Sequence, residues 1–209
     1  TRPGADAVSV EEEWTRVAPA IEAAVQTGVV VSIDTRKAEV ARRALNAGAR
    51  LFNDVSALTY DDGSLAVAHD FAEAGGAVTM QKDPQYDDVL REVYDYLFER
   101  VRASVEAGIS PEQIIVDPGI GFGKTLEHNL ELMRGLGSLH DIGCPILLGA
   151  SRKRFIGTLT GEDVAANRVH GSVAAAQMGI ALGAHIVRVH DVKPTVQALA
   201  VWSAVQGGA

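Results

Sequence analysis

The chain contains six short apolar runs, each ending in a polar residue, and a helix-forming stretch follows nearly every one. These runs span residues 29–34, 51–54, 77–80, 114–117, 146–153 and 186–191. This alternation is typical of a parallel α/β fold, in which rigid strands hold the working groups at their carboxyl ends. The polar tip residues are Asp34, Asn53, Asp117, Lys153, Arg188 and His190. Such a set suits a polar heterocycle and an anion.

Composition restricts the classes of partner. The 209 residues contain no linker and no low-complexity stretch, so we expect a single domain over residues 1–209. A net charge of −8 argues against nucleic acid as a partner. No apolar run reaches the roughly 18 residues of a membrane span, so no membrane partner is expected. The single cysteine, Cys144, fits a small buried hydrophobe and a cytoplasmic location.

The order of the runs favours one fold class. Six strand–helix units are two short of the eight that close a (β/α)8 barrel. An open, doubly wound sheet is the alternative, but its glycine-rich nucleotide signature is absent after the first strand, at residues 32–36. A barrel without its first two strands also explains a chain that opens in the loop-like sequence Thr1-Arg2-Pro3-Gly4. We therefore favour an α/β TIM barrel whose first two strands are missing from the chain.

Helix signals fall between the strands. A capping-box sequence at Ser9 begins a helix to about Gln26 that we expect to bend at Pro19. The longest predicted helix runs over 87–107, with Val89, Val93, Leu97 and Val101 on its buried side. Other helices are predicted over 37–47, 126–139 and 164–182, and a last one follows Asp191 as its cap.

The glycine-rich loop at residues 117–125 resembles a nucleotide loop in composition only. A P-loop requires glycine where Pro118 stands, and a dinucleotide fingerprint starting at Gly119 requires glycine where Lys124 stands. ATP and NAD binding through this loop are therefore disfavoured. A flexible loop would let Phe122 and the backbone approach a flat ligand, whereas the alternative is a plain strand–helix turn.

Two aspartates, Asp34 and Asp117, end apolar strands. A carboxylate at such a tip is partly desolvated and needs hydrogen-bond donors. The edge of a guanidine-like heterocycle offers two parallel N–H donors to one carboxylate. The alternative role is helix capping, which also places aspartate at strand ends.

Two groups of cations follow the last two strands. Arg152, Lys153 and Arg154 form a cluster that we expect to face a ligand or carboxylates, with a solvated charge run or a Schiff-base Lys153 as alternatives. Arg188 and His190 share one face of a strand beside a helix start, which suits phosphate. The remaining histidines show no spacing typical of zinc ligands.

Taken together, these segments resemble dihydropteroate synthase, a folate-pathway family. The resemblance rests on residues 1–4, 32–35, 53–56, 117–124, 149–153 and 188–191. It implies a TIM barrel, usually a homodimer, that condenses p-aminobenzoate with 6-hydroxymethyl-7,8-dihydropterin pyrophosphate. The implied cofactor is Mg²⁺, and pyrophosphate is released.

The resemblance also implies a role for each matching residue. Pterin would be held by Asp34, Asn53, Asp117 and Lys153. Pyrophosphate would be held by Thr1, Arg188, Val189 and His190. The p-aminobenzoate site would include Arg2, Phe122 and Arg154. The groups closest to the chemistry would be Lys153, Arg188 and His190. The family's Mg²⁺ ligand, an asparagine, would lie upstream of Thr1, so no metal ligand is assigned within the chain.

Three departures from the family pattern accompany the resemblance. Its first-strand segment is absent, and several residues usual around a His-Met pair are missing between Thr79 and Met80. We expect both to be segments of a longer protein. Arg154 stands where many relatives have serine, and could serve the benzoate carboxylate or lie outside the site. Two other functions remain open: a methyltetrahydrofolate-binding methyltransferase barrel and a non-catalytic pterin-binding paralogue.

Overall fold

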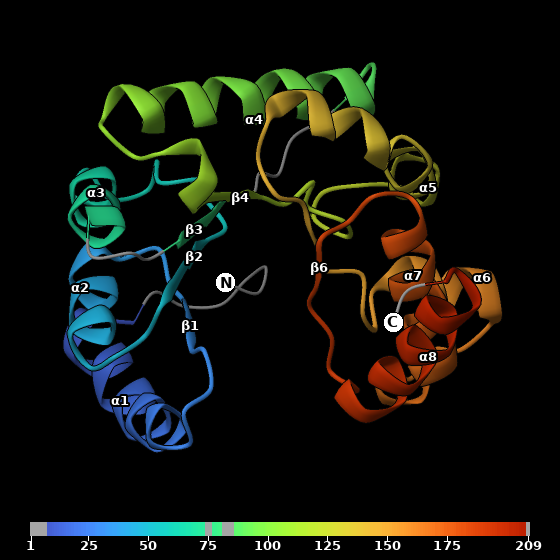
Figure 1. Cartoon of the computed structure of the whole chain (residues 1–209), viewed down its shortest axis with the longest axis horizontal. Helices are drawn as coiled ribbons and strands as arrows, with labels where there is room; N and C mark the ends of the chain where they lie inside the picture. Colours follow the sequence, from blue (N-terminus) through green and yellow to red (C-terminus); the bar gives the residue numbers. More distant parts are fainter. Residues whose placement is uncertain (1–7, 74–76, 81–85, 208–209) are drawn as a thin grey trace. The chain divides into compact units, whose positions relative to one another are not determined.

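A computed structural model describes residues 8–73, 77–80 and 86–207, so Thr1 and Arg2 lie outside the described residues. The chain forms two compact units (Figure 1). The first comprises Thr1–Met80 and Arg102–Ile114, and the second comprises Gln81–Val101 and Ile115–Ala209. Single-domain organisation stays a prediction.

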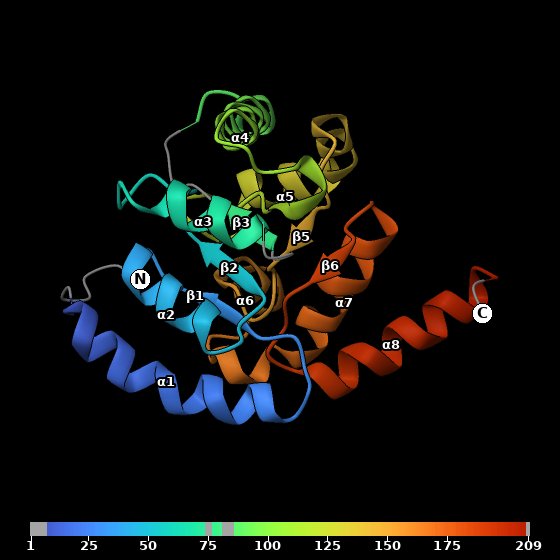
Figure 2. The ribbon, with the colours of Figure 1, turned by 60° about the vertical axis from the view of Figure 1, so that its left-hand side comes forward.

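The first unit is built on parallel strands. Its elements are α1 (Val10–Gln26), β1 (Ser32–Asp34), α2 (Ala38–Asn46), β2 (Leu51–Asp54), α3 (Ser64–Glu73), β3 (Ala77–Met80) and the short 3-10 helix η1 (Pro111–Gln113). β2 pairs with β1 on one side and with β3 on the other, and all three strands are parallel (Figure 2). Phe52, in the middle of β2, is fully buried and anchors the strand in the core.

Helix α1 begins as the sequence predicts and is tied to the end of β1. The Ser9 hydroxyl accepts a hydrogen bond from the Glu12 N–H at 3.1 Å, which caps the helix. Near its first turn, Glu13 forms an ion pair with Lys37 and accepts a hydrogen bond from the Thr35 hydroxyl. These contacts hold the segment that follows Asp34.

The second unit carries the remaining strands in parallel. Its elements are most of α4 (Val89–Glu106) and β4 (Ile114–Val116), followed by α5 (Leu126–Arg134), η2 (Leu136–Ile142), β5 (Leu147–Leu148), α6 (Arg154–Thr160), η3 (Ala165–Asn167), α7 (Val169–Ala181), β6 (Ile186–Val187) and α8 (Val192–Val205). Val116 bridges Ile146, and β5 pairs with β6. The carboxyl ends of β4, β5 and β6 therefore face the same edge.

Close packing of α7 supports β5. A Cβ atom at Gly179 would lie 2.1 Å from Leu148 Cδ2, and one at Gly171 would lie 2.4 Å from Ile156 Cγ2. Glycine at both positions lets α7 approach β5 and α6 more closely than a larger residue would. The loop after β5 therefore rests on a tightly packed support.

Several element predictions need correction. The helix expected over 126–139 ends at Arg134, and a 3-10 helix takes over from Leu136. The helix expected from 164 begins at Val169. Helices α3 and α6 were not predicted. No helix in the described ranges combines the length and apolar character needed to cross a membrane.

Candidate functional site

In the first unit, the pairing of β1 with β2 places two predicted pterin ligands side by side. Asp34 is the register partner of Asn53, and the Asn53 carbonyl accepts a hydrogen bond from the Thr35 N–H at 3.0 Å. Asp34 is exposed and Asn53 is half-buried. A carboxylate and an amide thus lie next to each other at the carboxyl edge of the sheet, as the sequence predicted for each strand separately.

The turn after Asn53 is organised by a buried carboxylate that sequence reasoning missed. Asp54 accepts hydrogen bonds from the Ser56 N–H at 2.7 Å, the Ser56 hydroxyl at 2.6 Å and the Leu58 N–H at 3.2 Å. Burial raises the pKa of Asp54, while these donors lower it. Ala57 and Leu58 adopt left-handed backbone with φ of 54° and 62°, a strained conformation for L residues that the Asp54 contacts stabilise.

In the second unit, Asp117 follows β4 and is 7% exposed. Burial raises its pKa to about 6, while the hydrogen bond from the Gly119 N–H (2.8 Å) and the charges of Lys153, Arg188 and Lys124 lower it. The carboxylate is therefore desolvated beside several cations. This is the environment in which hydrogen-bond donors of a ligand gain most.

The glycine-rich loop after Asp117 needs its three alternate glycines. Gly119, Gly121 and Gly123 have φ of 71°, 80° and 54°, in the left-handed region. A Cβ atom at Gly121 would lie 2.7 Å from the Lys153 Cδ. The buried Asn129 accepts a hydrogen bond from the Gly121 N–H at 2.6 Å and so fixes the loop. The loop is a built structure that admits Lys153, and not a plain turn.

Lys153 and Phe122 meet above this loop. The Lys153 Nζ lies 3.6 Å from the centroid of the Phe122 ring, a cation–π distance. On the neighbouring strand end, a Cβ atom at Gly149 would lie 3.7 Å from the Asp117 Oδ2, so the carboxylate lies beside β5. The second unit thus gathers an aromatic face, an ammonium group and a desolvated carboxylate.

Arg154 lies next to a cavity. A space of about 560 Å³ is lined by part of the glycine-rich loop and by α6: Gly121, Gly123, Lys124, Thr125, Leu126, Asn129, Arg154, Phe155 and Thr158. Lys124 and Arg154 give it a positive charge without a lining carboxylate. Such a cavity suits an anionic group.

The predicted anion ligands follow β6. The Arg188 N–H donates to the Leu148 carbonyl at 3.0 Å, and the side chains of Arg188 and His190 are exposed with half-buried Val189 between them. Ser151, which the sequence did not single out, holds His190: its hydroxyl accepts from the His190 N–H at 3.2 Å and lies 3.0 Å from Nδ1.

The three cations after β5 have different surroundings: Lys153 lies over Phe122, Arg154 lines the cavity, and Arg152 binds Asp191. Arg152 does not face a ligand, since its guanidinium binds Asp191 through Nε at 3.0 Å and a terminal nitrogen at 2.6 Å. This contact holds the pKa of Asp191 below its usual range. Asp191 is the N-cap residue of α8, as predicted, but its carboxylate binds Arg152 and makes no cap hydrogen bond.

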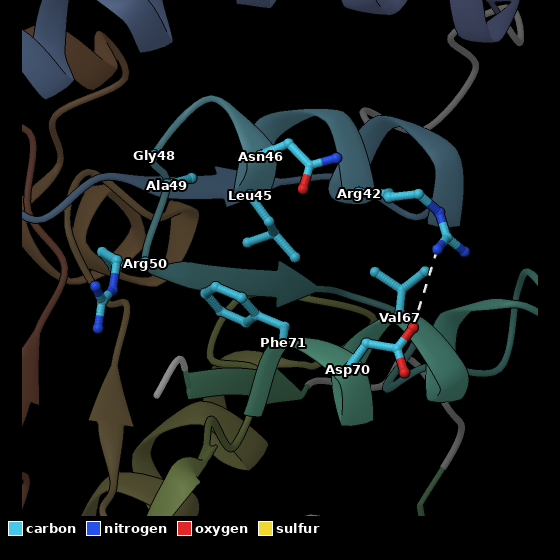
Figure 3. A pocket seen from close by; sticks show the side chains of 9 residues that line it. All are labelled: Arg42, Leu45, Asn46, Gly48, Ala49, Arg50, Val67, Asp70 and Phe71. Atoms are coloured by element: carbon cyan, nitrogen blue, oxygen red, sulfur yellow. Dashed lines mark ion pairs between the residues drawn. The ribbon is translucent and has the colours of Figure 1, made fainter. Parts of the chain in front are cut away.

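A separate cavity lies away from these residues. It measures about 390 Å³ and is lined by α2, α3 and the segment leading into β2: Arg42, Leu45, Asn46, Gly48, Ala49, Arg50, Val67, Asp70 and Phe71. Figure 3 shows Arg50 at one end and the Arg42–Asp70 ion pair at the other. It contains none of the predicted site residues.

Comparisons with known proteins identify the family. A family model described as pterin binding enzyme matches residues 1–190. The dihydropteroate synthase of Neisseria meningitidis serogroup B is 49% identical over 217 residues, covering 98% of this chain and 76% of the relative. The chain belongs to the dihydropteroate synthase family. It is a transferase of the dihydropteroate synthase type, so the family, activity and enzyme class predicted from sequence are confirmed.

Solved dihydropteroate synthases confirm the predicted α/β TIM-barrel class. The enzyme of Xanthomonas albilineans with 4-aminobenzoic acid has a TM-score of 0.94 and 46% identity, covering all of this chain and 77% of that one. The same enzyme in complex with 7,8-dihydropteroate has a TM-score of 0.92 and 45% identity, covering 99% and 78%. These likenesses support the barrel over the open doubly wound sheet.

Proposed function

We propose that this chain joins p-aminobenzoate to 6-hydroxymethyl-7,8-dihydropterin pyrophosphate, with Asp117 and Lys153 holding the pterin. The observation that carries the proposal is the buried Asp117 carboxylate beside the Lys153 ammonium and the Phe122 ring. The carboxylate accepts two N–H groups from the guanidine-like pterin edge, and the ammonium donates to the ring. The pterin role of Asp34 and Asn53 stays a prediction, supported by their adjacent positions on β1 and β2.

The reaction needs no protein nucleophile. As pyrophosphate leaves with the electron pair of the C–O bond, the electron-rich dihydropterin stabilises positive charge on the exocyclic carbon. The amine of p-aminobenzoate attacks that carbon, forms the C–N bond and loses one proton to solvent. Arg188 and His190 bind the leaving oxygens, while Lys153 orients the ring. We propose that the benzoate lies near Phe122, with its carboxylate toward Arg154 and the positively charged cavity.

The direct test is to mix both substrates with the wild-type chain and measure dihydropteroate and pyrophosphate together. We expect the two products in equal amounts. A methyltransferase barrel or a non-catalytic paralogue would bind pterin and release no pyrophosphate, which would contradict the proposal.

Arg188→Ala and His190→Ala should separate leaving-group binding from ring binding. Both residues come directly after β6 and belong to the proposed anion site. Each change should therefore weaken pyrophosphate binding by about tenfold or more. Free 6-hydroxymethylpterin should bind nearly as before. Calorimetry with each ligand checks this, and an equal loss for both ligands in a folded variant would remove the pair from the anion site.

The involvement of Mg²⁺ rests on the resemblance. Within the described ranges no three His, Cys, Asp or Glu side chains converge as metal ligands, and the cations around Asp117 disfavour a further cation there. These residues do not fit a magnesium site, and a role for Mg²⁺ in turnover stays a prediction. Turnover that is unchanged by chelation with EDTA would contradict this role.

Homodimer formation is proposed from α8. The helix is largely apolar, yet Thr195 is its only buried residue, and Val192, Val196, Val201 and Val205 are each more than half exposed. A helix with apolar residues all round is normally covered, which a second copy would achieve. Sedimentation should show a dimer, and Val196→Asp should give monomers; a wild-type monomer at micromolar concentration would contradict the proposal.

The cytoplasmic location stays a prediction.

A further inference from the structure

The loop after β5 and the segment after β6 are joined by polar side-chain contacts. We propose that Arg152 and Asp191, together with Ser151, form a positioning clamp that fixes Lys153 and His190 relative to each other. The inference rests on the proposed function, because the two fixed residues are the ones assigned to ring and leaving group. In this role the clamp residues touch no substrate.

The contacts of the clamp run in parallel between adjacent segments. Two guanidinium nitrogens of Arg152 donate to the two carboxylate oxygens of Asp191, the bidentate geometry that restricts rotation of both groups. One residue before each partner, the Ser151 hydroxyl meets the His190 N–H and Nδ1. The Arg152 and Asp191 side chains are only 28% and 15% exposed, which limits screening of the pair by solvent.

The backbone conformation of Arg152 links the clamp to the orientation of the Lys153 side chain. Arg152 has φ of 58°, in the left-handed region that a non-glycine residue adopts only when surrounding contacts hold it. The reversal lets the Arg152 side chain point to Asp191 while the next side chain, Lys153, lies over Phe122. If the Arg152–Asp191 contact is lost, we expect the backbone to relax and Lys153 to leave this position.

Helix α7 and the turn before it also hold this loop, through its backbone. The Ser172 hydroxyl accepts from the Arg152 N–H at 2.8 Å. The Arg168 guanidinium donates to the Arg152 carbonyl at 3.1 Å and to the Lys153 carbonyl at 3.4 Å. The loop is therefore fixed at its amide and carbonyl groups, and the Arg152 side chain supplies the link to β6. Ser172 and Arg168 therefore support the loop itself, whereas the Arg152 side chain fixes the position of the loop relative to His190.

The competing role for Arg152 is direct binding of the substrate anion. In that case Asp191 would only restrain a ligand-binding cation, and the two residues would not have equal effects. If the pair is a clamp, removing either Arg152 or Asp191 breaks the same contact. The two single variants should then lose activity to the same extent, and the double variant should lose no more. A double-mutant cycle distinguishes the two roles.

The experiment uses Arg152→Gln, Asp191→Asn and the double variant in the full chain. We expect each to lower kcat by about 10- to 100-fold, the size of effect that misplacement of reacting groups produces. The KM for p-aminobenzoate and the affinity for inorganic pyrophosphate should change by less than about threefold. Arg152→Lys, which keeps one hydrogen bond and the charge, should fall between wild type and Arg152→Gln.

A matched control is available in the first unit. Arg43 forms a comparable bidentate pair with the exposed Glu11, so Arg43→Gln should leave kcat unchanged. Additive losses in the double variant, or weak pyrophosphate binding in Arg152→Gln alone, would overturn the clamp. If the wild-type chain makes no dihydropteroate, the proposed function fails instead. The clamp then still predicts that both single variants shift the His190 ring signals in the NMR spectrum of the free chain, and unchanged signals would overturn it.

Discussion

Replacing Asp117 by asparagine is expected to weaken pterin binding by about 2–4 kcal/mol, the range for unpairing a buried charged hydrogen bond. The change keeps the shape of the side chain but removes the charge that accepts two N–H donors. Asp117 is 7% exposed, so water cannot compensate the lost charge. Calorimetry with 6-hydroxymethylpterin measures the effect on a variant shown to be folded by circular dichroism.

A suitable control is Asp141→Asn, since Asp141 is an exposed carboxylate of the same unit. It should bind the pterin like the wild type. Wild-type affinity in a folded Asp117→Asn chain would remove Asp117 from the pterin site, and with it the main support for the proposed ring orientation.

The same residue gives stability and binding opposite pH dependences. Burial raises the pKa of Asp117 to about 6, above the value of about 3.9 for an unfolded aspartate. Between these values the folded chain binds more protons than the unfolded chain, so the free energy of unfolding falls as pH rises and levels off above pH 6. The difference between the folded and unfolded pKa of Asp117 corresponds to a loss of about 3 kcal/mol in the free energy of unfolding.

Comparison with Asp117→Asn isolates this contribution, because other groups, including Asp54, titrate in both chains. The variant should therefore be more stable than the wild type to urea at pH 8, and the two should converge near pH 4. Pterin affinity of the wild type should instead decrease as pH falls below about 6, because the protonated carboxyl accepts fewer donors. A variant less stable than wild type at pH 8 would contradict the cost assigned to the buried charge.

Lys153→Arg is expected to lower kcat by about 100-fold, although it keeps the positive charge. The Lys153 Nζ lies 3.6 Å from the Phe122 ring centroid, and its side chain passes so close to Gly121 that a Cβ there would meet it at 2.7 Å. A planar, bulkier guanidinium cannot occupy this position without displacing the ring. Product formation under saturating substrates provides the measurement, and Lys193→Arg on exposed α8 is the control expected to remain normal.

A second measurement tests the covalent alternative for Lys153. An aldolase-type lysine forms an imine with a carbonyl substrate, and borohydride traps it irreversibly. We expect no adduct with the pterin substrate or with simple sugar phosphates. An adduct mapped to Lys153 would overturn its assignment, and near-normal condensation by Lys153→Arg would show that the residue supplies charge without a shaped contact.

The elements that the sequence predicted well are those with a long periodic signal. The stripe of Val89, Val93, Leu97 and Val101 is buried throughout α4, and strands begin at or within three residues of the expected positions. Helix α6 escaped prediction because its seven residues are too few to show a period. The 3-10 helix after Arg134 depends on packing, since Leu136 and Leu139 are fully buried.

The site shows a similar division. Asp117, Lys153 and Arg188 could be predicted as site residues because each lies at or just after the end of an apolar run that predicts a strand. The residues that hold these groups carry no such signal, since the contacts of Ser151 with His190 and of Asn129 with Gly121 depend on the folded chain. Asn129 lies four residues after the helix cap Thr125, where an amide looks like an ordinary surface residue until its burial is known.

The alternating glycines after Asp117 bear on how this enzyme can evolve. Any side chain at 119, 121 or 123 would meet a strained left-handed backbone, so these positions tolerate little variation. Ile120, Phe122 and Lys124, between and beside them, have no such restriction, and two of the three lie against the proposed benzoate region. Adaptive change, including escape from an inhibitor that competes with p-aminobenzoate, is therefore channelled to 122 and 124. An inhibitor that draws its affinity from close packing against these glycines would leave selection few substitutions from which to choose.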